Sequence, residues 1–326
     1  MAQPVHFLTT NVLDIAFERY GEPGRFPVVL LHGFPYDPRS FDQVAAQLAA
    51  KGAEVIVPSL RGYGPTRFRS AATMRSGQQA ALAADLRDLI DGLGLHQPIV
   101  AGFDWGGRAA CVAAMLWPER VSGLVTIGGY NVHDVAAMAT VPEPPATEAR
   151  NWYQWYFQSD RGREGLHRYR RELARQLWRE WSPGWDFDDE TFEATAASFD
   201  NPDFVDVVVH SYRVRYGLVA GDPHYEQSEA TIAAQPPIDV PTIVIDPTDD
   251  PVSPPSAREE HESHFTRLLD YRQTPVGHNT PREDPAIVLA SILDLRPRSA
   301  FGSADSRRSC SCAARSRVTA PRPRIH

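Results

Sequence analysis

The segment GFDWGG at residues 102–107 restricts the possible folds of this chain more than any other feature. The apolar run at 97–104 is typical of a buried strand, and residues 107–120 have helical spacing that ends at Pro118. A sharp turn from a strand into a helix holds its apex side chain in strained backbone geometry and needs small neighbours. We therefore expect Asp104 at the apex of such a turn. The alternative is that Asp104 only caps the following helix.

Short β-branched runs alternate with longer helical patterns along most of the chain, which is the pattern of a mostly parallel sheet flanked by helices. The runs that predict buried strands lie at residues 26–33, 53–60, 97–104, 121–129 and 240–247. Residues 78–95 predict a helix between two of them, and residues 5–21 an edge hairpin. The fold class is therefore α/β.

The alternation stops after Tyr130 and resumes near Val240. The intervening segment contains five of the seven tryptophans and several helical stretches, between proline-rich boundaries at 142–145 and 236–241. We predict that residues 131–236 form a helical lid, hereafter the cap, inserted into a core made of residues 1–130 and 237–296. An aromatic insertion over the carboxyl ends of a sheet is well placed to close a site.

The charge of the chain is unevenly distributed. Residues 297–326 hold seven Arg and one Asp, a balance of +6 within a net charge of -8, which leaves -14 on residues 1–296. An acidic body argues against nucleic acid as a partner. The basic tail consists mainly of Arg, Ser, Ala and Pro, a composition that predicts disorder.

No apolar run approaches the length of a membrane span, and no secretory signal is visible at the start of the chain. We therefore expect a cytoplasmic protein with no membrane partner. Its three cysteines, Cys111, Cys310 and Cys312, are too few for a disulfide framework, and no Cys/His cluster has zinc spacing. We expect neither a metal nor a cofactor, and the sequence leaves the oligomeric state open.

A carboxylate at the apex of the turn suits nucleophilic displacement at an sp3 carbon, because the product is an alkyl ester that water can cleave. Such chemistry points to epoxides or alkyl halides. The water needs a base, for which we predict His278, in the loop between the strand-like run 268–277 and the final helix. The base needs an orienting acid in the loop after the strand at 240–247, where spacing favours Asp250 over Asp249.

An oxyanion hole is predicted from two backbone N–H groups. One belongs to Phe34, in the HGFP segment at 32–35 that directly follows the apolar run PVVLL at 27–31, and the other to Trp105, the residue after the nucleophile. The alternative for HGFP is a simple tight turn at Gly33 and Pro35.

The motifs HGFP, GFDWGG, DDPV and GHNTPRED, in this order over residues 1 to about 296, resemble those of α/β-hydrolases of the epoxide hydrolase branch. This resemblance implies an α/β-hydrolase core with an inserted helical cap. Haloalkane and haloacid dehalogenases share the aspartate nucleophile and the tryptophan that follows it.

The resemblance also implies two cap tyrosines that donate hydrogen bonds to the epoxide oxygen. The segments WYQWYFQ at 152–158 and SYR at 211–213 match the family contexts, and thus assign this role to Tyr153 and Tyr212. Phenols can protonate an alkoxide leaving group without acting as bases at neutral pH. The alternative is that both only pack within an aromatic cap.

Some positions separate the epoxide hydrolase branch from its relatives. Phe34 stands where haloalkane dehalogenases usually have Asn or Glu, and Trp105 stands where fluoroacetate-type enzymes have an arginine. Arg108 could bind an acid group, although a helix-surface arginine is favoured. Phe103 and Pro247 replace the histidine and glycine usual in epoxide hydrolases, which suggests a divergent member.

The sequence thus predicts a cofactor-independent hydrolase that opens a small apolar or aromatic epoxide to a vicinal diol through an ester on Asp104. One alternative is a haloalkane or haloacetate dehalogenase with the same residues. The other is a non-catalytic binding protein of the same fold with a cap.

Overall fold

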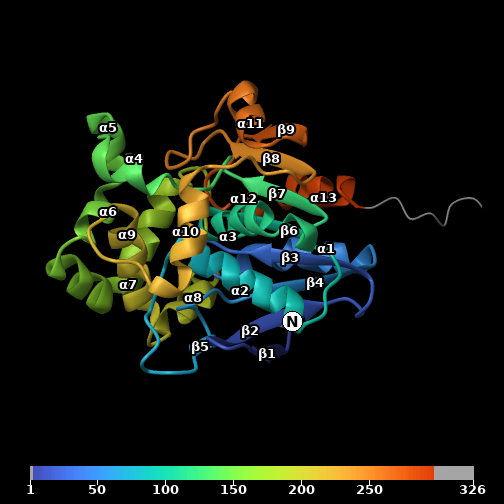
Figure 1. The fold of residues 1–326 in the computed structure, drawn as a ribbon, viewed down its shortest axis with the longest axis horizontal. Coiled ribbons are helices and arrows are strands. Elements are labelled where there is room, and N and C mark those ends of the chain that lie inside the picture. The colour runs from blue at the N-terminus through green and yellow to red at the C-terminus, as the bar shows by residue number, and fades with distance from the viewer. Residues whose placement is uncertain (1–2, 297–326) are drawn as a thin grey trace, which may run out of the picture. The chain divides into compact units, whose positions relative to one another are not determined.

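The computed structural model of this chain describes residues 3–296, so the predicted disorder of the basic tail concerns residues outside those described. Nine strands form one sheet in the order β1-β2-β4-β3-β6-β7-β8-β9, with β5 paired to β2 (Figure 1). The strands are β1 (Val5–Thr9), β2 (Leu13–Tyr20), β3 (Phe26–Leu31), β4 (Ala53–Pro58), β5 (Arg67–Phe68), β6 (Ile99–Phe103), β7 (Gly123–Ile127), β8 (Thr242–Pro247) and β9 (Leu268–Thr274).

The sheet is antiparallel at one edge and parallel elsewhere. β1 and β2 form the predicted edge hairpin, and β2 also pairs antiparallel with β4. From β4 through β9 the neighbouring strands are parallel. The central parallel strands are buried along nearly their whole length, as continuous apolar runs require when helices cover both faces.

The helices outside the cap are α1 (Asp42–Ala50), α2 (Gln79–Gly92), α3 (Asp104–Leu116), α11 (Arg258–His264), α12 (Thr280–Glu283) and α13 (Pro285–Asp294), with 3-10 turns η1 (Pro38–Phe41) and η2 (Pro118–Arg120). α2 packs on α3, while α1 packs on α13. The predicted helix at 107–120 begins earlier, at Asp104, and ends before Pro118. The carboxyl end of β6 therefore passes into α3 without a linker.

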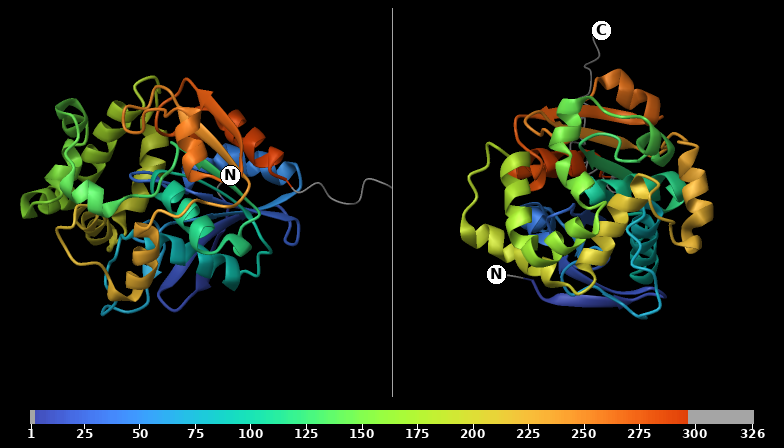
Figure 2. Two further views of the ribbon diagram at one scale, coloured as in Figure 1. Left: turned by 45° about the horizontal axis from the view of Figure 1, so that its top comes forward. Right: turned by 90° about the vertical axis from the view of Figure 1, so that its left-hand side faces the viewer.

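The chain between β7 and β8 is helical. Its elements are α4 (Val135–Thr140), α5 (Pro145–Arg150), α6 (Trp152–Tyr156), α7 (Asp160–Trp181), α8 (Asp189–Ala196), η3 (Ala197–Asp200), α9 (Phe204–Arg215), η4 (Pro223–Tyr225) and α10 (Glu226–Ala233). Figure 1 shows α4 to α7 and α9 beyond one end of the sheet, and the left view of Figure 2 shows the same segments there. α10 instead contacts α2 and α3, so the last helix of the insertion rests on the core.

The core and the cap group as one compact unit. The indole Nε1 of Trp178 in α7 donates a hydrogen bond of 2.9 Å to the carbonyl of Pro35, just beyond β3. The cap therefore lies over the carboxyl ends of the parallel strands, where ligands bind in open α/β sheets. Among the described residues, none of the helices has the length and apolarity that crossing a lipid bilayer requires.

Candidate active site

Asp104 occupies the apex of the turn between β6 and α3. Its φ is 48°, in the left-handed region, which costs a non-glycine residue about 1–3 kcal/mol. The site can hold this conformation because the neighbouring backbone comes very close: a Cβ on Gly33 would lie 2.6 Å from the Cβ of Asp104, and one on Gly106 would collide with the carbonyl of Leu31. These glycines let the loop after β3 and the start of α3 meet around the carboxylate.

The Asp104 side chain faces the loop after β3. The backbone N–H of Phe34 donates a hydrogen bond of 2.7 Å to Oδ1 of Asp104. The contact comes from 70 residues away in sequence rather than from the first turn of α3, so it does not support the helix-capping alternative. Trp105 lies in that first turn, where backbone N–H groups have no partner inside the helix.

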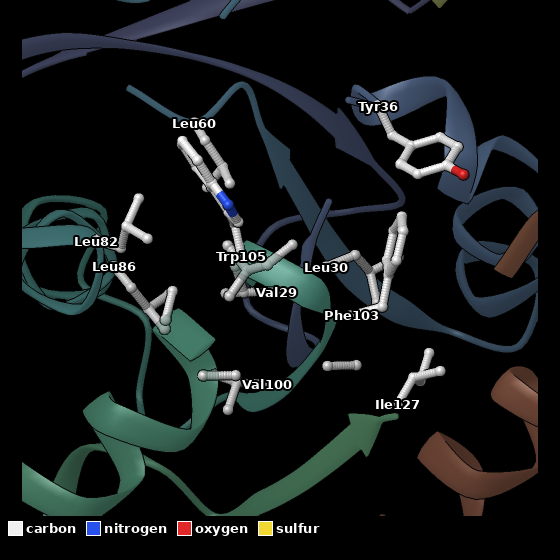
Figure 3. Packing of buried hydrophobic residues seen from close by; sticks show 14 of the residues in the cluster. Val29, Leu30, Tyr36, Leu60, Leu82, Leu86, Val100, Phe103, Trp105 and Ile127 are labelled. Atoms are coloured by element: carbon white, nitrogen blue, oxygen red, sulfur yellow. The ribbon is translucent and has the colours of Figure 1, made fainter. Parts of the chain in front are cut away.

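The two neighbours of Asp104 are both fully buried. Figure 3 shows Trp105 extending toward Leu60, while Phe103 lies near Tyr36. The ring centroids of Phe103 and Tyr36 are 5.3 Å apart, and that of Phe103 is 5.9 Å from the ring of His278. Packing on both sides therefore fixes the turn, and Phe103 forms part of the environment of His278.

His278 and Asp250 form a buried pair. Nδ1 of His278 lies 2.7 Å from Oδ2 of Asp250, and the other oxygen of Asp250 accepts a hydrogen bond from the backbone of Val252. Asp249 is exposed, and its side chain is near Thr248 instead. The structure thus brings His278 together with the favoured acid. Nε2 of His278 is buried and has no partner among the described residues, so it is free for a water or ligand.

The charge environment of His278 suits a base. Burial by itself lowers the pKa of His278, but the charge of Asp250, the hydrogen bond to it and the charge of Asp104 act in the opposite sense, and the net pKa is raised. Because the charge of Asp104 is one of the influences that raise this pKa, its carboxylate lies within electrostatic reach of the imidazole.

The loop that carries His278 is held by residues that the sequence analysis did not single out. Glu283 accepts hydrogen bonds from the backbone of Gly277 at 3.0 Å and from the hydroxyl of Ser182 at 2.7 Å. The backbone of His278 donates to the carbonyl of Trp181 at 3.1 Å. Glu283 belongs to the GHNTPRED motif, and this position was the available signal for its role.

Tyr153 from α6 and Tyr212 from α9 are buried side by side. Their ring centroids are 5.4 Å apart and nearly perpendicular. Burial raises the pKa of both phenols, and the charge of Asp104 raises them further. The Tyr153 oxygen accepts a hydrogen bond of 2.9 Å from Gln154, which leaves its own O–H to donate elsewhere.

The Phe34 ring joins the core to the cap. Its centroid lies 5.5 Å from that of Tyr212 and 6.3 Å from those of Tyr153 and Trp181. Such aromatic contacts bury large areas in a defined geometry. The residue whose N–H contacts Asp104 therefore also contacts both predicted tyrosines.

A cavity of about 820 Å³ opens beside Asp104. Of the seven predicted site residues, Asp104 and Tyr153 line it. The other lining residues near Asp104 are polar as well as apolar, and include Arg108, His133, Gln154 and Arg215. The cavity is large enough for a ligand that carries an aromatic ring.

Two arginines that line this cavity are buried, which the sequence analysis did not predict. The expectation that Arg108 lies on the helix surface is wrong: its residue is 5 % exposed, because it packs beside His133 and residues of α9 that line the same small pocket. Arg215 is 6 % exposed and was not identified. A signal for each was present, since Arg108 is four residues after Asp104 and Arg215 three after Tyr212, spacings that place side chains on one helix face.

Within residues 3–296, the His, Cys, Asp and Glu side chains form no group of three that could hold a metal ion. The functional groups gathered around Asp104 include an imidazole paired with a carboxylate, phenols, backbone N–H donors and the guanidinium groups of Arg108 and Arg215.

Comparison with known proteins gives consistent results. The model of the α/β hydrolase fold family matches residues 27–285. A crystal structure of a candidate epoxide hydrolase from Klebsiella pneumoniae subsp. pneumoniae is 42 % identical with a TM-score of 0.87, and the alignment covers 89 % of this chain and 96 % of that one. A structure of Epoxide Hydrolase A from Mycobacterium thermoresistibile, at 21 % identity and a TM-score of 0.71, covers 90 % of this chain and 98 % of that one and shares the fold.

Curated relatives match over shorter segments. Epoxide hydrolase 4 of Mus musculus is 30 % identical over 141 residues, which are 43 % of this chain and 38 % of that protein. Epoxide hydrolase A of Mycobacterium tuberculosis is 30 % identical over 155 residues, 46 % of each chain. The matched segments thus span less than half the length of these two relatives. The family match over most of the chain, together with the sheet order and the site at its carboxyl edge, shows that this chain belongs to the α/β hydrolase fold family.

Proposed function

We propose that this protein is an epoxide hydrolase that forms a covalent alkyl ester on Asp104 and releases a vicinal diol. The observation that carries the proposal is the pair of buried phenols, Tyr153 and Tyr212, beside each other and within the electrostatic reach of Asp104. Ring opening needs a proton donor on the leaving oxygen, whereas halide displacement does not. The names of the relatives above support the same choice of substrate.

In the first step, a carboxylate oxygen of Asp104 attacks an epoxide carbon and the C–O bond of the ring breaks. Tyr153 and Tyr212 hold the leaving oxygen, and one phenol transfers its proton to the alkoxide as it forms. Burial keeps both phenols protonated at neutral pH, because it raises their pKa values. The products of the step are an alkyl ester on Asp104 and a tyrosinate.

In the second step, Nε2 of His278 takes a proton from water, and the hydroxide attacks the ester carbonyl carbon. The oxyanion of the tetrahedral intermediate accepts hydrogen bonds from the N–H groups of Phe34 and Trp105. Collapse expels the diol alkoxide, which takes the remaining carboxyl proton, so Asp104 returns as a carboxylate. The proton on His278 returns to the tyrosinate.

The test is an assay of epoxides and matched organohalides for diol and for halide. We expect diol from the epoxides, and expect the Tyr153→Phe/Tyr212→Phe double variant to lose about 100-fold or more in kcat/KM, the typical contribution of general acid catalysis. Tyr169→Phe is the control, since Tyr169 is 57 % exposed on the cap. Halide release without diol formation, or a double variant as active as the control, would overturn the proposal.

A further inference from the structure

Two arginines line the cavity beside Asp104, one from the core and one from the cap. Arg108 comes from α3 in the core and Arg215 from the end of α9 in the cap. Both side chains line the cavity that contains Asp104, yet the residues are only 5 % and 6 % exposed. Arginine is seldom buried to this extent unless an anion balances its charge.

The polar partners of these arginines are neutral. Nη2 of Arg108 lies 2.8 Å from Nε2 of His133, and Nη1 of Arg215 donates to the amide oxygen of Gln154 at 3.3 Å. The guanidinium carbon of Arg215 is 4.4 Å from the ring centre of Tyr212. Neither arginine takes part in an ion pair within residues 3–296, and the Nε of each is buried without a hydrogen-bond partner there.

The electrostatics of the pair are unfavourable without an anion. Burial and the charge of Arg215 lower the pKa of Arg108 to about 10, so Arg108 remains charged at neutral pH. Burial and the two arginines also lower the pKa of His133 well below its usual value, which keeps His133 neutral and able to accept from Arg108. Two adjacent buried cations with unused donors form a preorganised anion site.

We propose that Arg108 and Arg215 bind a carboxylate group of the substrate, so that the preferred substrates of the proposed epoxide hydrolase are epoxides bearing a carboxylate. The planar donors of guanidinium match a carboxylate in two-point contact. Two arginines against one Asp104 leave one positive charge in excess, which a singly charged group neutralises.

The register of the two helices indicates where this carboxylate lies. Arg108 is one helical turn from Asp104 on α3, and Arg215 is about one turn from Tyr212 on α9. The Cβ atoms of Arg108 and Asp104, and those of Arg215 and Tyr212, are therefore about 5–6 Å apart. Anchoring of both arginines next to the proposed catalytic residues favours an acid with its carboxylate on or next to an epoxide carbon, and the cavity of about 820 Å³ leaves room for an aromatic ring.

The competing explanation is that the arginines only balance the charge of the Asp104 carboxylate. In that case their loss would impair acidic and neutral epoxides equally. A specificity measurement separates the two explanations, because a carboxylate site affects the ratio between the substrates.

The experiment compares kcat/KM for 3-phenylglycidate and for 3-phenylglycidamide, which differ only in the charge of one group. We expect the wild type to prefer the acid, and Arg215→Met and Arg108→Met each to reduce the acid-to-amide ratio about 30-fold, as the loss of a charge-assisted hydrogen bond does. Arg215→Lys retains part of the preference. Arg163→Met is the matched control, because Arg163 lies on the cap in an exposed ion pair with Asp206.

Calorimetric binding of phenylacetate and phenylacetamide to the wild type and the same variants gives a readout that needs no turnover. Tighter binding of the acid, lost in Arg215→Met and kept in Arg163→Met, supports the anion site even if neither epoxide is hydrolysed, a result that would defeat the proposed function alone. An acid-to-amide ratio that does not change in Arg215→Met and Arg108→Met overturns the inference. Hydrolysis of both epoxides without preference, together with equal binding of the two probes, also overturns it and leaves the proposed function intact.

Discussion

Asp249 and Asp250 are neighbours in the chain, but the backbone after β8 gives their side chains opposite environments. Asp250 is buried and paired with His278 at 2.7 Å, whereas Asp249 is exposed. A carboxylate in this position holds the imidazole in one tautomer and stabilises its protonated form during catalysis.

These neighbours provide a matched pair of variants. We expect Asp250→Asn to lower kcat about 100-fold or more, because the amide no longer compensates the charge that develops on His278. Asp249→Asn should stay within about twofold of wild type, as expected for an exposed residue. Steady-state kinetics on one epoxide checks both values, and a larger loss in Asp249→Asn would reverse the assignment of the acid.

The pH dependence of the reaction follows from the raised pKa of His278. His278 acts as a base only when neutral, so activity should fall as the pH drops through its pKa, which lies above 6.5. The phenols have pKa values raised above 10, so activity should show no loss from their ionisation below pH 10. In Asp250→Asn the acidic limb should move to lower pH, since burial then acts without the carboxylate that opposes it. A limb at the same pH in both proteins would argue against His278 as the titrating base.

Motifs were sufficient to predict positions that depend on sequence-local geometry, and insufficient for positions that depend on distant packing. Asp104 follows from the glycines around it, and His278 from its place after the last strand. The position of Arg215 beside Arg108 depends on α9 and α3 reaching the same small pocket. These segments are about 100 residues apart in the chain, so no local pattern encodes it. The burial of Arg108 was misjudged for the same reason.

At the level of elements, Asp37 links the loop after β3 to the cap. This buried carboxyl accepts hydrogen bonds from Thr195 at 3.0 Å and Ser198 at 2.8 Å, at the end of α8 and in η3. Burial raises the pKa of Asp37 to about 7, although the hydrogen bonds act in the opposite sense. Between about pH 4 and pH 7, the folded protein therefore keeps a proton on the Asp37 carboxyl that the unfolded chain, with a pKa near 3.8, releases.

The sign of the resulting pH effect is fixed by linkage. Protonated Asp37 makes its full contribution to the free energy of unfolding below about pH 4. This contribution is lost as the pH rises to about 7. Between pH 5 and pH 8, we expect the free energy of unfolding of wild type to decrease by up to about 3 kcal/mol relative to Asp37→Asn. Urea denaturation at the two pH values measures this difference. Asp249→Asn should track wild type, and an Asp37→Asn protein that also tracks wild type would exclude the link.

The elements themselves were largely predictable, since each of the five apolar runs became a parallel strand. The start of α3 was placed three residues too late, because Asp104 has a positive φ and yet belongs to the helix. The two-residue strand β5 has too few residues for a periodic pattern. Its pairing with β2 depends on where the preceding loop returns to the sheet.

At the scale of the whole molecule, the parallel strand order gathers the loops that follow β3, β6, β8 and β9 at the carboxyl ends of these strands. These loops carry Phe34, Asp104, Asp250 and His278, and the cap adds Tyr153. The order of these residues along the chain, read from the motifs, already implied that arrangement. The size and polarity of the cavity could not be predicted, because they depend on how the cap helices pack over the sheet.

The central claim is that the hydroxyl oxygen delivered to the product comes from Asp104, which then regains an oxygen from water. A single turnover in ¹⁸O-water, with the protein in excess over an epoxide, tests it by mass spectrometry of the diol and of the peptide that contains Asp104. The account predicts ¹⁸O in the Asp104 carboxylate and an unlabelled diol. An ¹⁸O-labelled diol with an unlabelled Asp104 would mean direct attack by water and would contradict it.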